Sequence, residues 1–182
     1  MPKKPTTTRE EMIEGAFELI RREGYQVLTA RSLARELGCS TQPIMYQFPN
    51  LDELRELAYE RADVFHTQYL MQTADFLEIG IRYIQFAHEE GNLFRFLFQS
   101  GRFDGENLKE MIHGEGVRQI IDAAASELEM NEEQAADAFE ALFAMVHGYG
   151  CLIADNALQY DEEAVRRILV SVGEGMMRGS RT

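Results

Sequence analysis

Residues 28–54 read LTARSLARELGCSTQPIMYQFPNLDEL and contain two short helical segments separated by a glycine. The first segment starts after Thr29, a favourable N-cap residue, and ends before Gly38, which supplies the left-handed conformation that commonly closes a helix. The second segment, 41–47, follows Ser40 as its predicted cap, with a proline in its first turn where a missing N–H costs little. This pattern predicts a helix-turn-helix unit.

Helices are also predicted on both sides of this unit. One amphipathic helix is expected from Thr8 to Glu23, and another begins at Asn50, with Glu53 in the position of a capping box. Further helical segments are expected at about 75–90, 92–99, 105–129, 131–155 and 160–178. Alternation with period two is nearly absent. The sequence therefore predicts an all-α protein of about nine helices, with a three-helix module at 1–50 and a helical domain at 51–182.

The composition is that of an ordinary globular protein, with 45% apolar and 27% charged residues over 182 positions. No apolar run approaches the ~18–20 residues of a membrane span, and the N-terminus leads into polar threonines. Cys39 and Cys151 match no zinc or redox spacing. We therefore expect a cytoplasmic protein with reduced thiols, no secretory signal and no membrane partner.

Charge is distributed unevenly along the chain. The whole chain carries −13, but residues 1–50 carry +1 and residues 51–182 carry −14. The first nine residues hold three positive charges and no negative one. This asymmetry favours an N-terminal end that tolerates a polyanion and a body that is repelled by it.

The helix-turn-helix stretch resembles the TetR family of transcriptional regulators over about residues 9–58. It shares the threonine-capped helix, the LA…LG-x-S sequence, the short helix that ends in Phe48, and the N-x-[DE]-E-L sequence that begins at Asn50. In that family the short helix enters the major groove of DNA, where its first residues meet base edges. The resemblance implies a DNA-binding regulator.

The resemblance also implies which residues contact DNA. They are Thr29, Arg31, Ser40, Thr41, Gln42, Pro43, Tyr46, Lys3 and Lys4. Thr41 and Gln42 are expected to read bases, Gln42 most naturally an adenine, while Pro43 is placed to touch a thymine methyl group. Specificity would come from these contacts, and affinity mostly from contacts to phosphates.

Phosphate contacts are implied for Thr29 and Tyr46, and a phosphate or a guanine edge for Arg31. The alternative interpretation is that Thr29 and Ser40 only cap helices and that Tyr46 only packs. Two positions depart from the family pattern, since many members have tyrosine where this chain has Met45 and lysine where it has a leucine, position 51. Both departures remove expected contacts to the DNA phosphate backbone, so the affinity for DNA would depend more on Tyr46 and the N-terminal tail.

The body is similar to a regulatory-domain subgroup of the same family, in the sequences YIQFAHEEGNLFRFLF at 83–98 and MVHGY at 145–149. The resemblance implies a homodimer in which the last two long helices pair with their copies, through Ala141, Ala144, Gly148, Val165, Ile168, Val172 and Met176. It also implies a site for a small-molecule effector, for which the candidate lining residues are Met71, Phe86, Phe94, Phe98, Phe103, Met111, Met145 and Tyr149. The alternative for both sets is ordinary packing within the chain.

Two alternatives to a regulator are a helical enzyme with a metal site and a helical binding protein. Glu110 and His113 have the Glu-x-x-His spacing of di-iron bundles, but such sites need a second copy of the motif. No nucleophilic triad, phosphate loop or Cys-x-x-Cys appears, so we expect no enzyme, no metal and no cofactor. Met45 and Leu51 leave open a helical ligand-binding or interaction protein with a degenerate helix-turn-helix. The favoured interpretation is a homodimeric repressor that binds a palindromic DNA operator and is released by an unidentified small-molecule effector.

Overall fold

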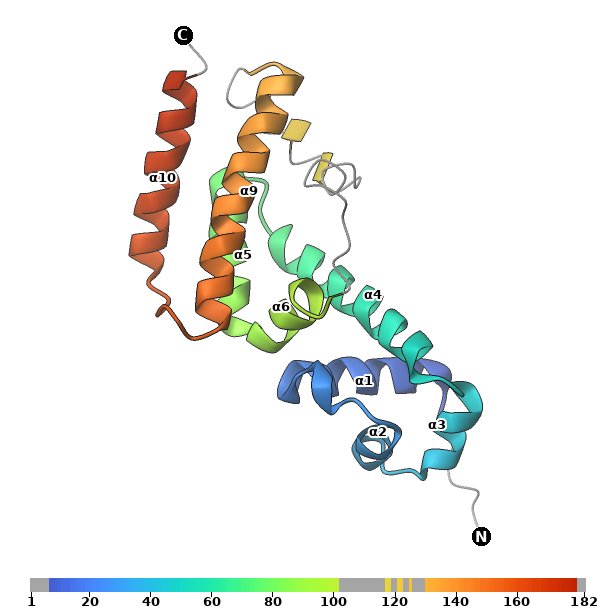
Figure 1. Ribbon diagram of the computed structural model, residues 1–182. Coiled ribbons are helices and arrows are strands. Elements are labelled where there is room, and N and C mark those ends of the chain that lie inside the picture. The colour runs from blue at the N-terminus through green and yellow to red at the C-terminus, as the bar shows by residue number, and fades with distance from the viewer. Residues whose placement is uncertain (1–6, 102–116, 119–120, 123–124, 126–129, 180–182) are drawn as a thin grey trace. The chain divides into compact units, whose positions relative to one another are not determined.

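The computed structural model describes residues 7–101, 117–118, 121–122, 125 and 130–179. Within them lie eight α-helices, one short 3-10 helix and no strand, so the predicted all-α fold is confirmed. The elements in chain order are α1 (Arg9–Glu23), η1 (Tyr25–Val27), α2 (Ala30–Glu36), α3 (Thr41–Gln47), α4 (Leu51–Leu70), α5 (Phe76–Glu89), α6 (Gly91–Phe98), α9 (Glu132–Ala154) and α10 (Glu162–Gly179) (Figure 1). Most of the predicted segment 105–129 lies outside the described residues.

The helices fall into two compact units. The first combines residues 1–66 with 92–103, and the second combines 67–91 with 104–182. By packing, most of α4 and all but the first residue of α6 therefore belong with the N-terminal helices. The sequence predicts a functional boundary between residues 50 and 51, which separates the helix-turn-helix module from the helical domain. Packing units do not test functional boundaries, so this boundary stays a prediction.

The first unit begins with a helix whose N-terminus is closed by its own side chains. Thr8 Oγ1 accepts a hydrogen bond from the N–H of Glu11, and the Glu11 carboxylate accepts one from the N–H of Thr8. At the other end Gly24 adopts φ +90°, a conformation that a residue with a Cβ avoids. The helix thus ends where predicted and starts one residue later, with Thr8 as its cap, and it buries Met12 and Phe17 in the core.

The second unit is held together through α5, which packs against both α9 and α10. The buried Gly80 allows this approach, since a Cβ added there would lie 3.6 Å from Leu169 and 3.7 Å from Val146. An ion pair of 3.1 Å joins Arg166 of α10 to Glu78 of α5. None of the helices described is long and apolar enough to span a bilayer.

One histidine is part of the core of the first unit. His66 is 7% exposed, and its ring packs edge-on against Phe98 with the centroids 5.4 Å apart. Burial disfavours the charged imidazolium and lowers the pKa of His66 from its ordinary 6.5 to about 4. The folded protein therefore keeps this side chain neutral at pH values where the unfolded chain protonates it.

We expect His66 to make stability fall as the medium is acidified from pH 6.5 towards pH 4. The contribution of the neutral side chain to stability is complete above pH 6.5, and its loss reaches about 3 kcal/mol below pH 4, where both states are protonated. Denaturant unfolding at several pH values should show a shallower loss over this window in His66→Leu than in the wild type. His88→Leu, at an exposed position, is the matched control and should keep the wild-type slope. Equal slopes for His66→Leu and the wild type would contradict the assignment.

Candidate nucleic-acid interface

Residues 37–40 join α2 to α3 through a turn that depends on one glycine. Gly38 adopts φ +60°, in the left-handed region that glycine tolerates without strain. Its N–H donates to the carbonyl of Arg35 at 3.3 Å, and the N–H of Cys39 donates to the carbonyl of Ala34 at 3.0 Å. These two bonds are those of a Schellman motif, which uses the last free carbonyls of α2 and reverses the chain. The role predicted for Gly38 is confirmed.

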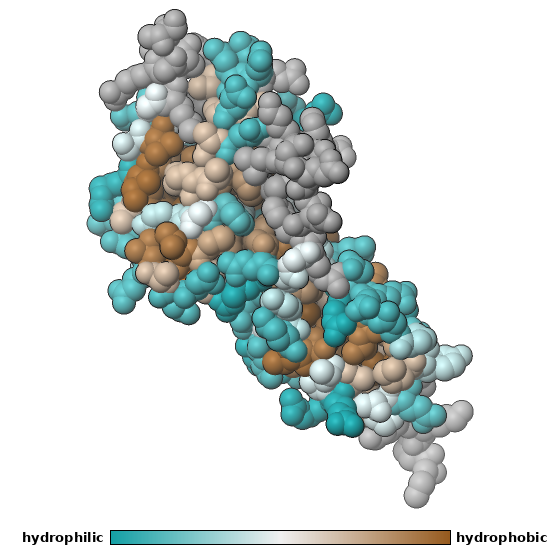
Figure 2. Space-filling model, viewed as in Figure 1, coloured by the Kyte–Doolittle hydropathy of each residue, from teal (hydrophilic) through white to brown (hydrophobic). Residues whose placement is uncertain are grey.

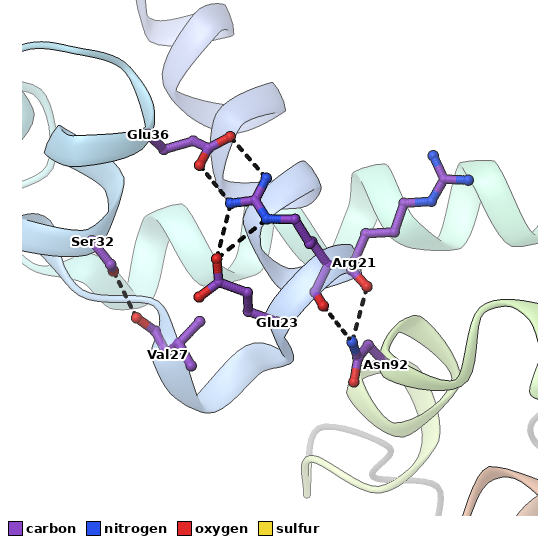
Figure 3. A network of polar contacts seen from close by, with 7 residues as sticks. Arg21, Glu23, Val27, Ser32, Glu36 and Asn92 are labelled. Atoms are coloured by element: carbon purple, nitrogen blue, oxygen red, sulfur yellow. Dashed lines mark hydrogen bonds and ion pairs between the residues drawn. The ribbon is translucent and has the colours of Figure 1, made fainter.

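The N-terminus of α2 is closed by a reciprocal cap. Thr29 Oγ1 accepts from the N–H of Ser32 at 3.1 Å, and Ser32 Oγ accepts from the N–H of Thr29 at 2.9 Å. Ser32 Oγ also donates to the carbonyl of Val27 at 2.6 Å (Figure 3). The Thr29 hydroxyl therefore serves the capping role that the sequence left open as its alternative, and its phosphate contact stays a prediction.

The N-terminus of α3 differs from the expectation. Ser40 occupies the N-cap position with extended backbone, but its side chain forms no capping hydrogen bond. The residue is exposed. The interpretation of Ser40 as only a cap is thus not supported, and its hydroxyl is available for a ligand.

The rotation of α3 about its axis is fixed by the side chains that it buries. Ile44 and Phe48 are fully buried, as is Leu33 on α2. Leu37 and Cys39, predicted on the same buried side, are partly buried. Because these residues lock one side of α3 into the core, the opposite side must face solvent.

That outward side carries Thr41, Gln42, Met45 and Tyr46, all of them exposed. Tyr46 is 83% exposed and Met45 is 44% exposed. The alternative interpretation required Tyr46 to pack into the core, and it does not. The structure thus brings together both predicted base-reading residues and Tyr46. Pro43, also predicted to touch DNA, is half-buried beside this face. We name Thr41, Gln42, Met45 and Tyr46 the readout face.

The sequence did not assign Met45 to this face. It was interpreted only as the loss of a phosphate-binding tyrosine. The signal that identifies it is helical spacing, since Met45 lies four residues after Thr41 and three after Gln42.

The first turn of α2 carries one basic side chain. Arg31 is exposed in the first turn of that helix, and it forms no hydrogen bond or ion pair with other described residues. Its guanidinium can therefore meet an anion without breaking an existing contact in that part of the chain. Lys3 and Lys4 lie outside the described residues.

Arg9, expected as part of a basic tail, has a structural role instead. Its guanidinium lies 4.3 Å above the centre of the Phe48 ring, donates to the Gln47 carbonyl at 3.4 Å and forms an ion pair with Glu53. Glu53, which the sequence places in a capping box, thus pairs with Arg9. The N-terminus of α4 is capped by Asn50, whose Oδ1 accepts a hydrogen bond from the N–H at position 52 at 3.0 Å. Arg9 closes the C-terminal end of α3 and helps to hold the readout face in place.

A polar network ties the C-terminal end of α1 to its neighbours (Figure 3). Arg22 donates to Glu36 on α2 and to Glu23, and this guanidinium holds the pKa of the Glu36 carboxyl below its usual value. Asn92 Nδ2 donates to the carbonyls of Arg21 and Arg22 at 3.0 and 3.1 Å, which joins α6 to the last turn of α1. These contacts fix α2 within the first unit.

The described candidate effector residues are divided between the two units. Phe94 and Phe98 pack against each other at 4.9 Å between ring centres in the first unit, while Phe86 is buried against Tyr69 in the second. Met145 and Tyr149 are half-buried on α9, and Met71 is 42% exposed after α4. Phe103 and Met111 lie outside the described residues. The lining of an effector pocket stays a prediction.

A chain of titratable side chains in the second unit was not foreseen. The Tyr83 hydroxyl lies 2.9 Å from Nδ1 of His147, and Cys151 Sγ lies 3.5 Å from Nε2 of the same ring. Burial raises the pKa of Tyr83 and lowers the pKa of His147, so both side chains are neutral near pH 7. The partners are 64 residues apart in sequence on α5 and α9, which is why no local pattern could indicate the pair.

The candidate dimer residues divide into two groups. Ala141, Ala144 and Gly148 are exposed on one face of α9, and Leu152, 50% exposed, continues the same face. We name these four residues the α9 stripe. Figure 2 shows exposed apolar surface on the second unit, in the region of α9 and α10.

On α10 the outcome is mixed. Ile168 is 39% exposed and Val172 half-buried, but Val165 is 1% exposed. Val165 therefore belongs to the core of its own protomer, which corrects its placement at the interface. The Met176 side chain lies outside the described residues.

Comparison with known proteins finds a matching family model and similar solved structures. Residues 76–172, more than half of the chain, match the family model described as "Tetracyclin repressor-like, C-terminal domain". Among solved structures, a tetR-family transcriptional regulator from Streptomyces coelicolor is similar, with a TM-score of 0.69 at 20% sequence identity. That similarity covers 94% of this chain and 81% of the other, and at this identity it shows the fold alone. No curated protein matches the chain.

Proposed function

The chain belongs to the TetR family of transcriptional regulators, and from this premise we propose that it binds a palindromic DNA operator as a homodimer, represses transcription there and is released by a small-molecule effector. The observation that carries the proposal is the readout face of α3, whose polar residues point outward while Ile44 and Phe48 anchor the helix from behind. Regulators of this family are not enzymes.

The α2–α3 unit has the features that major-groove binding requires. A recognition helix needs an outward face that the core does not use, and an attachment rigid enough to present that face in one orientation. The Gly38 turn, the Arg9 contacts and the Arg22 network supply the attachment. Thr41 and Gln42, at the first two positions of α3, lie where base contacts are made.

Dimerisation is proposed through the α9 stripe and the exposed Ile168 of α10. Small residues let helix axes approach closely, and this face leaves apolar side chains in water. A two-fold axis at this face would relate two readout faces, so the operator would share that symmetry.

Release by an effector requires that the second unit acts on the first through the chain that joins them. Two of the connections between the units lie in the described residues: α4, which crosses from one unit to the other after His66, and the junction of α5 with α6 at Gly91. An effector can shift the protein only by binding one conformer more tightly than the other. We propose α4 as the mechanical link, since it starts directly after the recognition helix.

Arg31 is proposed to bind a phosphate, and its replacement should show this in the salt dependence. Arg31→Ala is expected to weaken binding to all DNA sequences alike and to lower the slope of log K against log salt by about one for each protomer. The measurement is a fluorescence titration of operator and random duplexes between about 50 and 200 mM salt.

Arg118→Ala is the matched control, because Arg118 is also exposed but lies outside the helix-turn-helix unit and outside α9 and α10. It should leave the slope unchanged. A loss confined to one base pair in Arg31→Ala would instead assign the side chain to a guanine edge.

The proposed function is tested by selecting bound fragments of the source genome with the purified protein at about 150 mM salt, where non-specific binding is suppressed. We expect one or a few sites that share a palindrome. Recovery of nothing above background, with and without candidate effectors, would contradict the proposal. It would favour a helical binding protein whose helix-turn-helix no longer functions.

A further inference from the structure

The recognition helix contains no charged residue. Its sequence, TQPIMYQ, has neither an acidic first turn nor a basic last turn. Guanine is read mainly by arginine or lysine, and cytosine by carboxylates, so α3 lacks the usual readers of G·C pairs. Adenine is read by glutamine or asparagine, and thymine by apolar contact with its C5 methyl group. The chemistry of the readout face therefore fits A·T pairs.

Met45 is the apolar member of this face. Its side chain is 44% exposed, although the adjacent Ile44 is fully buried. Helical spacing places Met45 one turn after Thr41 and beside Gln42, next to the two positions expected to contact bases. A thioether side chain has no hydrogen-bond donor, and what it offers is a flexible apolar surface.

An exposed methionine gains free energy when apolar atoms cover it. In the major groove, the C5 methyl of thymine is the apolar group that a base presents. We propose that Met45 contacts this methyl group in each half-site and so restricts one position of the operator to thymine. The inference rests on the proposed function and adds to it a specificity-determining residue.

The test removes the methyl group from DNA and the side chain from the protein separately. Each thymine of the selected operator is replaced in turn by deoxyuridine, which differs only by the missing C5 methyl. Burial of one such group corresponds to roughly a fourfold change in an equilibrium constant. We expect wild-type affinity to fall by about that factor at the thymine that Met45 contacts in one half-site, and by roughly the square of it when both half-sites are changed.

Met45→Ala should bind more weakly than the wild type and should no longer distinguish thymine from deoxyuridine at that position. Alanine keeps the helix intact, and Met45 contributes little to the core. Met45→Leu retains an apolar side chain and should keep the distinction. Leu158→Ala is the matched control, because Leu158 is an exposed apolar side chain, 37%, outside α3 and outside the helices proposed to pair.

The outcomes separate the inference from the function on which it rests. If selective binding is found but Met45→Ala shows the same thymine preference as the wild type at every position, the inference about Met45 is overturned. The proposed function as a DNA-binding regulator is then still supported. If the wild type binds no site selectively, the proposed function fails and the inference fails with it.

Discussion

Replacing Thr41 and Gln42 together by alanine is expected to abolish selective binding while non-specific binding to DNA remains. Both side chains are exposed at the start of α3, and neither belongs to the core, so the fold should survive. A good base contact discriminates by about 1–3 kcal/mol, and each protomer would lose two. We therefore expect the ratio of operator affinity to random-sequence affinity to fall by at least about a hundredfold.

The matched control uses the other exposed Thr-Gln pair of the chain. Thr67 and Gln68 lie on α4, outside the recognition helix, and their double replacement by alanine should leave the ratio unchanged. Titration of operator and random duplexes with each variant gives both affinities. If discrimination survives in the Thr41 and Gln42 variant, other residues read the bases and our assignment is wrong.

Ala144→Glu is expected to convert the dimer to monomers and to weaken operator binding by the order of a hundredfold. The α9 stripe consists of small and apolar residues, so a carboxylate there would be buried without a partner in the proposed interface. Monomers would bind two half-sites independently and lose the gain that comes from joining them. Sedimentation at micromolar concentration should show the 20.8 kDa species for the variant and twice that mass for the wild type.

Ala74→Glu is the corresponding control. Ala74 is exposed before α5 and lies on neither of the helices proposed to pair, so this variant should remain dimeric. A wild type that sediments only as a monomer would refute the dimer directly. A dimer that persists in Ala144→Glu would place the interface elsewhere on the protein.

The bounds of the N-terminal helices could be predicted from sequence because local signals fix them. α3 begins and ends where Pro43 and the spacing of Ile44 from Phe48 placed it, although the Ser40 side chain forms no capping bond. The capping of α1 by Thr8 has the same origin, since its partner lies three residues away. Such contacts form within one turn, so their pattern is visible in the sequence.

Contacts between distant residues could not be predicted in this way. The sequence places Arg9 in a basic N-terminal tail, because its partners, the carbonyl of Gln47 and the carboxylate of Glu53, lie 38 and 44 residues away and leave no local signal. Val165 fits the apolar pattern of α10, and only the packed structure shows that it faces its own protomer. Periodicity identifies the apolar side of a helix, but it does not say whether a neighbour or a second copy covers it.

Met45 illustrates a third limit of prediction from sequence. Comparison with the family pattern shows that position 45 lacks the usual tyrosine, but it does not show what a methionine does there. Its exposure next to Thr41 and Gln42 follows from the burial of Ile44 and Phe48, which the pattern alone does not measure. The substitution then becomes a candidate source of sequence preference.

The central claim is that two symmetry-related readout faces bind one palindrome, and the spacing between half-sites tests it most directly. Half-sites read by such a dimer lie about one helical turn apart, so inserting about five base pairs at the operator centre rotates one half-site to the opposite side of the duplex. Equilibrium titration should show two protomers on the intact operator and affinity near the non-specific level after the insertion. Unchanged affinity and stoichiometry on the altered operator would contradict the account.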